Sequence, residues 1–170
     1  MHHAPEAPAG YMRYRRARAI DGPAVRSMVL RCSAESLYGR FLTVVLPETA
    51  ASRMVDDLGS ESATWWLAEV ERVVVGIGAT HMFEDGSAEI SMLIEDDWQR
   101  RGIATTLLPA LVEEARVRRA SRIWATALGE RMPIMRRLAE GVGGSLQVSI
   151  SAGIAEMTAE LTALPVRAAS

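Results

Sequence analysis

Residues 96–108 read Asp-Asp-Trp-Gln-Arg-Arg-Gly-Ile-Ala-Thr-Thr-Leu-Leu, a charged segment that passes through Gly102 into an apolar helical pattern. Residues 88–94, just upstream, form a β-rich run. After Gly102, apolar residues recur at helical spacing on one face: Ile103, Leu107, Leu108, Leu111, Val112 and Ala115. The stretch therefore predicts the exit of a strand, a glycine turn and the start of a helix at Ile103.

The start of this predicted helix has the properties of an anion site. The first backbone N–H groups of a helix have no intrahelical acceptor, and the helix dipole is positive at that end. Gly102 and Ala104 carry little side chain, so an anion can reach the backbone, and Arg100, Arg101 and Thr105 can add charge or a hydroxyl. The segment has neither the Gly-Lys-Ser/Thr of a P-loop nor the G-x-G-x-x-G of a dinucleotide site. A glycine turn with solvated arginines explains the same residues, so the turn alone does not decide.

The remaining periodicity predicts one domain with a mixed sheet and helices on both of its faces, an α/β fold. Strands are expected over residues 14–19, 64–70, 73–81, 88–94, 123–128, 148–150 and 154–161. Helices are expected from Asp21-Gly22-Pro23 to Cys32, after a cap at Ser33, over 47–58, from Ile103 and over 133–140. Pro109 lies inside the helix that starts at Ile103 and predicts a kink there.

Composition excludes several classes of function. The 170 residues are 49% hydrophobic and 24% charged, with a net charge of −2, so no basic field attracts nucleic acid or a membrane surface. No apolar run reaches the roughly 18 residues of a membrane span, and the N-terminus lacks an export-signal pattern. We therefore expect a cytoplasmic protein with a disordered tail over 1–11, a domain over 12–162 and a tail or linker over 163–170. Cys32, the single cysteine, predicts no disulfide, and the Cys and His spacing predicts no metal site.

The segment Gln99-Arg100-Arg101-Gly102-Ile103-Ala104 resembles the acyl-CoA pyrophosphate loop of the GNAT N-acetyltransferases. The order of the predicted elements, from Met12 to Leu161, is similar to the order in that fold. The resemblance implies a GNAT-like fold, with a central, mostly antiparallel, twisted sheet of six to seven strands. It also implies an N-acetyltransferase that uses acetyl-CoA as co-substrate and an amine as acceptor.

Two further segments are similar to bacterial Pat-type protein lysine acetyltransferases. The Ser-x-x-Ser-x-Tyr-x-Arg-Phe pattern of that group is present from Ser33 to Phe41, and Ala88-Glu89-Ile90 resembles the strand that carries its catalytic glutamate. The resemblance implies that Glu89 is the general base of a direct transfer. It implies a protein lysine as acceptor, such as one on an acyl-CoA synthetase, and a fused regulatory domain as a further partner.

The same resemblance assigns the residues that hold acetyl-CoA. The backbone of Leu93 and Ile94 would pair with the pantetheine arm, and their strand would separate from the strand over 123–128 to admit it. The pyrophosphate would bind along the loop, at Gln99, Arg100, Arg101, Gly102, Ile103, Ala104 and Thr105. Glu130 occupies a cofactor-binding position at which many members have asparagine. Arg137 stands where many have a tyrosine acid, which leaves the general acid unassigned.

Other ionisable residues are weaker candidates. The acidic run Glu95-Asp96-Asp97 is expected to form a solvated loop, with attraction of a cationic lysine as the alternative. His81 lies at the end of a predicted strand and is expected to be structural rather than a base.

Two other functions fit the sequence. One is a GNAT enzyme that acetylates a small amine such as an antibiotic, a polyamine or an amino acid. A small amine predicts a closed pocket with acidic walls, whereas a protein acceptor predicts an open groove over Glu89. The other is a non-catalytic acyl-CoA sensor, which binds the cofactor but has no base in position.

Overall fold

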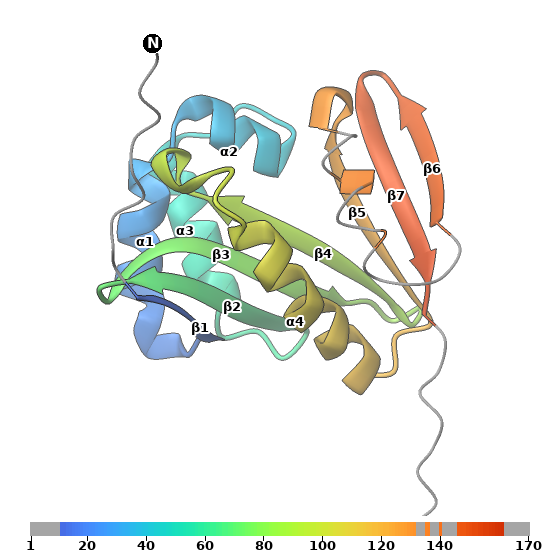
Figure 1. Cartoon of the computed structure of the whole chain (residues 1–170), viewed down its shortest axis with the longest axis horizontal. Helices are drawn as coiled ribbons and strands as arrows, with labels where there is room; N and C mark the ends of the chain where they lie inside the picture. The colour runs from blue at the N-terminus through green and yellow to red at the C-terminus, as the bar shows by residue number, and fades with distance from the viewer. Residues whose placement is uncertain (1–10, 132–134, 137–139, 141–145, 162–170) are drawn as a thin grey trace, which may run out of the picture.

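The computed structural model describes residues 11–131, 135, 136, 140 and 146–161. Within these residues, seven strands form one sheet in the order β1-β2-β3-β4-β5-β7-β6 (Figure 1). They are β1 (Met12–Arg16), β2 (Ala63–Val70), β3 (Val73–Met82), β4 (Ser87–Ile94), β5 (Arg122–Leu128), β6 (Leu146–Ser151) and β7 (Ile154–Glu160). Neighbouring strands are antiparallel except β4 and β5, which are parallel. The predicted mixed, mostly antiparallel sheet is confirmed.

Helices cover both faces of the sheet, as predicted. Helices α1 (Gly22–Arg31), α2 (Ala34–Phe41) and α3 (Pro47–Asp57) lie on one face, and α4 (Ile103–Val117) lies on the other (Figure 1). The buried apolar residues divide into two main cores that match these two layers. Met28 and Leu67 belong to the core under α1–α3, and Leu107 and Ile90 belong to the core under α4.

Glycines in β3 let α4 approach the sheet closely. A Cβ atom on Gly78 would lie 2.7 Å from Leu111 Cδ1, and one on Gly76 would lie 3.1 Å from Ile103 Cγ2. The hydroxyl of Thr80 donates to the carbonyl of Leu111 at 2.8 Å. The start of α4, with the loop that precedes it, is therefore fixed against the middle of the sheet.

The helix starts follow the predicted signals. Ser33 caps α2, where its Oγ accepts from the N–H of Ser36 at 3.1 Å, and Pro47 opens α3. Helix α4 runs through Pro109 as one element, and the predicted kink stays a prediction. The helix expected over 133–140 falls mostly outside the described residues. Among the described residues, no helix combines the length and the apolar character that crossing a membrane requires.

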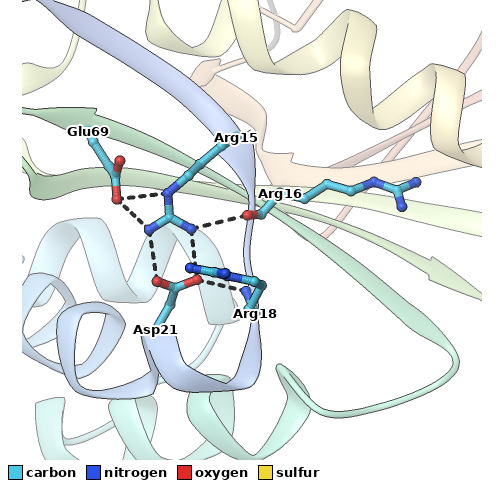
Figure 2. Close-up of polar contacts among 5 residues, drawn as sticks. All are labelled: Arg15, Arg16, Arg18, Asp21 and Glu69. Carbon is cyan, nitrogen blue, oxygen red and sulfur yellow. Dashed lines mark hydrogen bonds and ion pairs between the residues drawn. The ribbon is translucent and has the colours of Figure 1, made fainter.

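The first strand ends earlier than predicted, at Arg16 rather than residue 19, because a polar cluster turns the chain. Asp21 accepts from the N–H of Arg18 at 2.7 Å, which bends residues Ala19–Asp21 into a single 3₁₀ turn. Figure 2 shows the guanidinium of Arg15 between two carboxylates. It donates to both oxygens of Asp21 at 2.8 Å and, through Nε, to Glu69 at 3.1 Å. The cluster therefore joins β1, the turn and β2.

Candidate active site between the separated strands

Strands β4 and β5 pair along only their first three residues. Ser87, Ala88 and Glu89 lie opposite Arg122, Ile123 and Trp124, and no pairing with β5 follows along β4. The rest of β5 remains paired with β7 as far as Leu128, so the two halves of the sheet diverge from Glu89 onward (Figure 1). The separation that the sequence predicts for admitting a pantetheine arm is present.

The register of β3 and β4 decides which backbone groups of β4 face this opening. The N–H of Glu95 donates to the carbonyl of Val75, and the N–H of Phe83 donates to that of Ser87. Hydrogen-bonded pairs alternate along an antiparallel ladder, so the odd-numbered residues of β4 direct their backbone groups to β3. Leu93 is among them, opposite Ile77. Beyond Glu89, the last residue of β4 that is paired with β5, the backbone groups that face the opening belong to the even-numbered residues Met92 and Ile94.

An apolar pocket occupies the opening on the α4 side of the sheet. Its walls include Ile90 and Met92 of β4, Ile123 of β5, Met157 of β7 and Leu108 of α4. The lining is almost wholly apolar, which suits a thin, largely uncharged arm rather than a phosphate.

The loop before α4 has the geometry expected of an anion site. Gly102 is the N-cap residue of α4 with φ 82°, and a Cβ atom built on it would meet nothing within 4 Å. The first intrahelical bond runs from the N–H of Thr106 to the carbonyl of Gly102 at 3.1 Å. The amides of Ile103, Ala104 and Thr105 precede that bond and so have no intrahelical acceptor.

The side chains of the loop are less available than its backbone. Arg101 lies over the ring of Trp98, 5.0 Å from its centroid, and its Nη1 is buried with no partner among the described residues. Arg100 is exposed. Gln99 turns toward α2 and donates through Nε2 to Ser36 Oγ at 2.8 Å and to the carbonyl of Ile94 at 3.0 Å. Gln99 therefore holds the loop in place, and the carbonyl of Ile94 already has one partner.

The acidic run after β4 is exposed at Asp96 and Asp97, as the sequence predicts, but its carboxylates also bond to α1 and to the start of α2. Glu95 forms an ion pair with Arg31 at 2.8 Å. Asp96 accepts from the N–H of Ser33 at 2.9 Å, from Ser33 Oγ at 2.5 Å and from Ser36 Oγ at 2.9 Å. Burial raises the pKa of Asp96, but the hydrogen bonds from Ser33 and Ser36 outweigh it, so the pKa lies below its ordinary value.

Glu89 lies at the point where the strands separate, on the face of the sheet that α1–α3 cover. It is half-buried, opposite His81 on β3 and Trp124 on β5. Arg40 of α2 reaches the same face and donates to Ser91 Oγ at 2.9 Å. Burial lowers the pKa of Arg40, while the negative charges of Glu89 and Asp57 oppose that shift. The base predicted from the sequence therefore has an arginine beside it.

His81 is engaged by a different group. Its Nε2 forms a short contact with the carboxylate of Asp57, and its ring meets Trp65 edge-on at 5.5 Å between centroids. Its Nδ1 is buried with no partner among the described residues. These contacts agree with the structural role expected from the sequence.

A second, polar pocket lies on the Glu89 face over β5 and β7, and no local pattern in the sequence predicts it. It is lined by Phe83, Asp85, Ser87, Arg122, Trp124, Glu156 and Thr158. The rings of Phe83 and Trp124 lie 5.6 Å apart, and Arg122 pairs with Asp85 at 2.6 Å. The lining combines an aromatic wall with charges of both signs, and it begins next to Glu89 at Trp124.

Three remaining sequence assignments have simple outcomes. Glu130 is exposed in the 3₁₀ turn Gly129–Arg131 that follows β5. Arg137 lies outside the described residues. Cys32 is buried, and burial raises the pKa of its thiol to about 12, which disfavours the reactive thiolate form. The described residues include no group of three or more His, Cys, Asp and Glu arranged to hold a metal ion.

One known family has the same features. They are the wedge-shaped opening between the parallel strands β4 and β5 (the wedge), the helix that starts after a glycine, and the order of the elements. The family model described as "Acetyltransferase (GNAT) family" matches residues 32–140. The chain belongs to the GNAT acetyltransferase family. The predicted membership is thereby confirmed, and with it the N-acetyltransferase class of enzyme.

Solved GNAT structures resemble the chain over most of its length. The GNAT domain of S. lividans PAT has a TM-score of 0.74 and 22% identity, with 88% of this chain and 90% of that chain covered. A phosphinothricin acetyltransferase from Sinorhizobium meliloti, solved with acetyl-CoA, has a TM-score of 0.68 and 21% identity, with 88% of each chain covered. A ribosomal-protein-alanine N-acetyltransferase from Brucella melitensis has a TM-score of 0.64 and 23% identity, with 88% and 99% covered. At these identities the likeness establishes the GNAT fold.

Proposed function

We propose that this GNAT protein transfers the acetyl group of acetyl-CoA directly to the ε-amine of a lysine on another protein, with Glu89 as the general base. The observation that carries the proposal is the position of Glu89 at the apex of the wedge. Its strand partner Trp124 lines the polar pocket, and the next residue of β4, Ile90, lines the apolar pocket in the opening.

The described residues fit acetyl-CoA. The amides of Ile103, Ala104 and Thr105 suit the pyrophosphate, and the backbone of Met92 and Ile94 suits the amide groups of the pantetheine arm. Met92 takes the role that the sequence assigned to Leu93, because the backbone of Leu93 faces β3. When bound, acetyl-CoA supplies a thioester whose carbonyl carbon is the electrophile.

Glu89 performs the step that the acceptor amine requires. A lysine amine has a pKa of about 10.4, so at pH 7 roughly one in 2,500 is neutral, which corresponds to about 4.6 kcal/mol. Glu89 accepts the proton, directly or through a water, as the amine nitrogen bonds to the carbonyl carbon and the carbon–sulfur bond breaks. The sulfur leaves as a thiolate and takes a proton from solvent, since no side chain is assigned as the acid.

The polar pocket over β5 and β7 supports a protein acceptor. The notable features are its aromatic wall at Phe83 and Trp124, which suits the methylene chain of lysine, and the carboxylate of Glu156, which suits a neighbouring cationic residue. The Pat-type pattern from Ser33 to Phe41 and the likeness to S. lividans PAT support the same acceptor class. An acyl-CoA synthetase is the acceptor that this resemblance implies.

A small amine is the second candidate function. The specific observation in its favour is the likeness, at 21% identity, to a phosphinothricin acetyltransferase. Under that function the pocket beside Trp124 would hold the whole acceptor.

The composition of the chain allows a clean test. The chain contains 19 arginines and no lysine, so the protein has no ε-amine of its own. Any acetyl-lysine formed in a mixture with labelled acetyl-CoA and an extract of the source cells therefore comes from an acceptor. We expect labelled protein, with acetyl-lysine identified by mass spectrometry. Label confined to small molecules would favour the second candidate, and no label with any amine would favour the non-catalytic sensor.

The role of Glu89 is tested by Glu89→Gln. Loss of a general base should lower turnover about 100- to 10,000-fold while the affinity for coenzyme A is retained. The matched control is Glu84→Gln, which changes an exposed carboxylate in the turn before β4 and should leave turnover unchanged. Full turnover by Glu89→Gln would show that another group is the base.

A further inference from the structure

Helix α2 is fastened at its first residues to the loop that follows β4. The fastening group is the carboxylate of Asp96, which accepts three hydrogen bonds from Ser33 and Ser36. Ser33 is also the N-cap of α2. Asp96 therefore holds the start of this helix through both backbone and side chain.

The anion loop shares the same cluster. Gln99 donates to Ser36 Oγ at 2.8 Å, so Ser36 stands between Asp96 and the loop. The same Nε2 donates to the carbonyl of Ile94, one of the β4 residues that face the wedge. One set of hydrogen bonds thus orders the start of α2, the loop before Gly102 and the end of β4.

The other end of α2 lies at the acceptor side of the site. Arg40, in the last turn, donates to Ser91, which lies two residues from Glu89 on the same face of β4. Gly39 allows Arg131 to approach closely, because a Cβ atom at Gly39 would lie 3.2 Å from the Arg131 Cζ. A helix of 8 residues, about 12 Å long, therefore spans from the anion loop to the neighbourhood of Glu89.

We propose that Asp96 is a positioning residue for both substrate sites: by holding α2 to the anion loop, it makes the binding of the donor depend on the placement of Arg40 beside Glu89. The inference rests on the proposed function, in which coenzyme A binds at the loop and Glu89 is the base. A purely structural role would stabilise the fold without linking the two ends of α2.

The contacts at the start of α2 are tested by measuring the affinity for coenzyme A by calorimetry. Asp96→Ala removes three hydrogen bonds to a charged group and should weaken binding about tenfold. Asp96→Asn keeps an acceptor oxygen for the serine hydroxyls and should restore part of the loss. Asp97→Ala, which removes the exposed acid next in sequence, should bind as the unmodified protein does.

A substitution at the C-terminal end of α2 distinguishes coupling between the two ends of this helix from a local effect of Asp96 on the loop. Arg40→Gln is expected to weaken coenzyme A binding a few-fold, although Arg40 lies at the opposite end of α2. Combined with Asp96→Ala, its effect should be smaller than alone, because the link is already broken. In hydrogen exchange, coenzyme A should slow the α2 amides of the unmodified protein and not those of Asp96→Ala.

Three results would overturn the inference: unchanged affinity in Asp96→Ala, unchanged affinity in Arg40→Gln, or simple addition of the two effects. Failure of the proposed function looks different, because it would appear in the unmodified protein itself, as absence of coenzyme A binding or of acetyl-lysine formation, whatever the variants do. Asp96→Asn, which keeps most of the cluster, provides the comparison if Asp96→Ala folds poorly.

Discussion

At Gly102, backbone conformation and binding chemistry depend on the same atoms. Its φ of 82° lies in the left-handed region, which residues with a Cβ atom rarely adopt. A Cβ atom at this position would contact no other atom of the protein, so packing within the fold does not explain why the residue is a glycine. A glycine there serves both the turn and the access of an anion to the first amides of α4.

We expect Gly102→Val to weaken coenzyme A binding at least about tenfold, because the side chain enters the anion site and the turn is strained by about 1–2 kcal/mol. Calorimetry with coenzyme A measures the effect. Gly59→Val is the matched control, since a Cβ atom there also meets nothing within 4 Å and Gly59 lies at the end of α3. Equal affinity in the two variants would contradict the assignment of the anion site.

Candidate site residues could be proposed from the sequence where a local pattern marks them. Gly102 and Glu89 belong to short patterns that the chain displays in sequence. The role of Asp96 was not predictable, because its partner Ser33 is 63 residues away and nothing local marks the pair. Arg40 was part of a recognised pattern, but only the fold brings it to Ser91.

At the scale of elements, the cluster around Arg15 decides where β1 ends and how it joins β2. Hydrogen bonds from Arg15 lower the pKa of Asp21, against burial, which raises it. The hydrogen bonds that Arg15 donates to Asp21 and Glu69 in turn raise the pKa of Arg15, and the charges of the two carboxylates add to the effect. The residues are largely buried, so each depends on the others for compensation of its charge.

The lowered pKa of Asp21 makes stability depend on pH in a defined direction. Its contribution is fully present above the ordinary value of 3.8 and is lost as the pH falls through the folded-state value. Asp21→Asn should lower the free energy of unfolding by about 1–3 kcal/mol at neutral pH and reduce its fall in acid. Urea denaturation between neutral and acidic pH measures both quantities.

Asp56→Asn, at an exposed site on α3, is the control for this effect and should change the free energy of unfolding little. An acid profile in Asp21→Asn as steep as that of the unmodified protein would show that other carboxylates dominate.

For the whole molecule, the decisive feature is that β4 and β5 pair at one end and separate at the other. Helix α4 lies on one face of the sheet and α2 on the other (Figure 1). The register leaves the even-numbered residues of β4 with backbone groups that face the opening.

Hydrogen exchange of β4 tests this arrangement. The amides of Met92 and Ile94 should exchange quickly in the free protein and more slowly with coenzyme A, because a bound pantetheine arm and closure of the wedge protect them. The amides of Ser91 and Leu93 bond to β3 and should be protected in both states, which makes them internal controls. Rapid exchange at Leu93 in the free protein would contradict the register.

The sequence by itself determined the order of elements, the helix starts at Ser33 and Ile103, and the glycine turn at Gly102, because caps, turns and periodicity act between residues a few positions apart. It also led to Glu89 as the proposed base, through a local resemblance. Only the tertiary structure decided that Met92 rather than Leu93 faces the wedge, because strand register depends on pairing with β3. It alone joined Asp96 to Ser33 and Arg40 to Ser91, since hydrogen bonds between residues more than 50 positions apart exist only once the chain has folded.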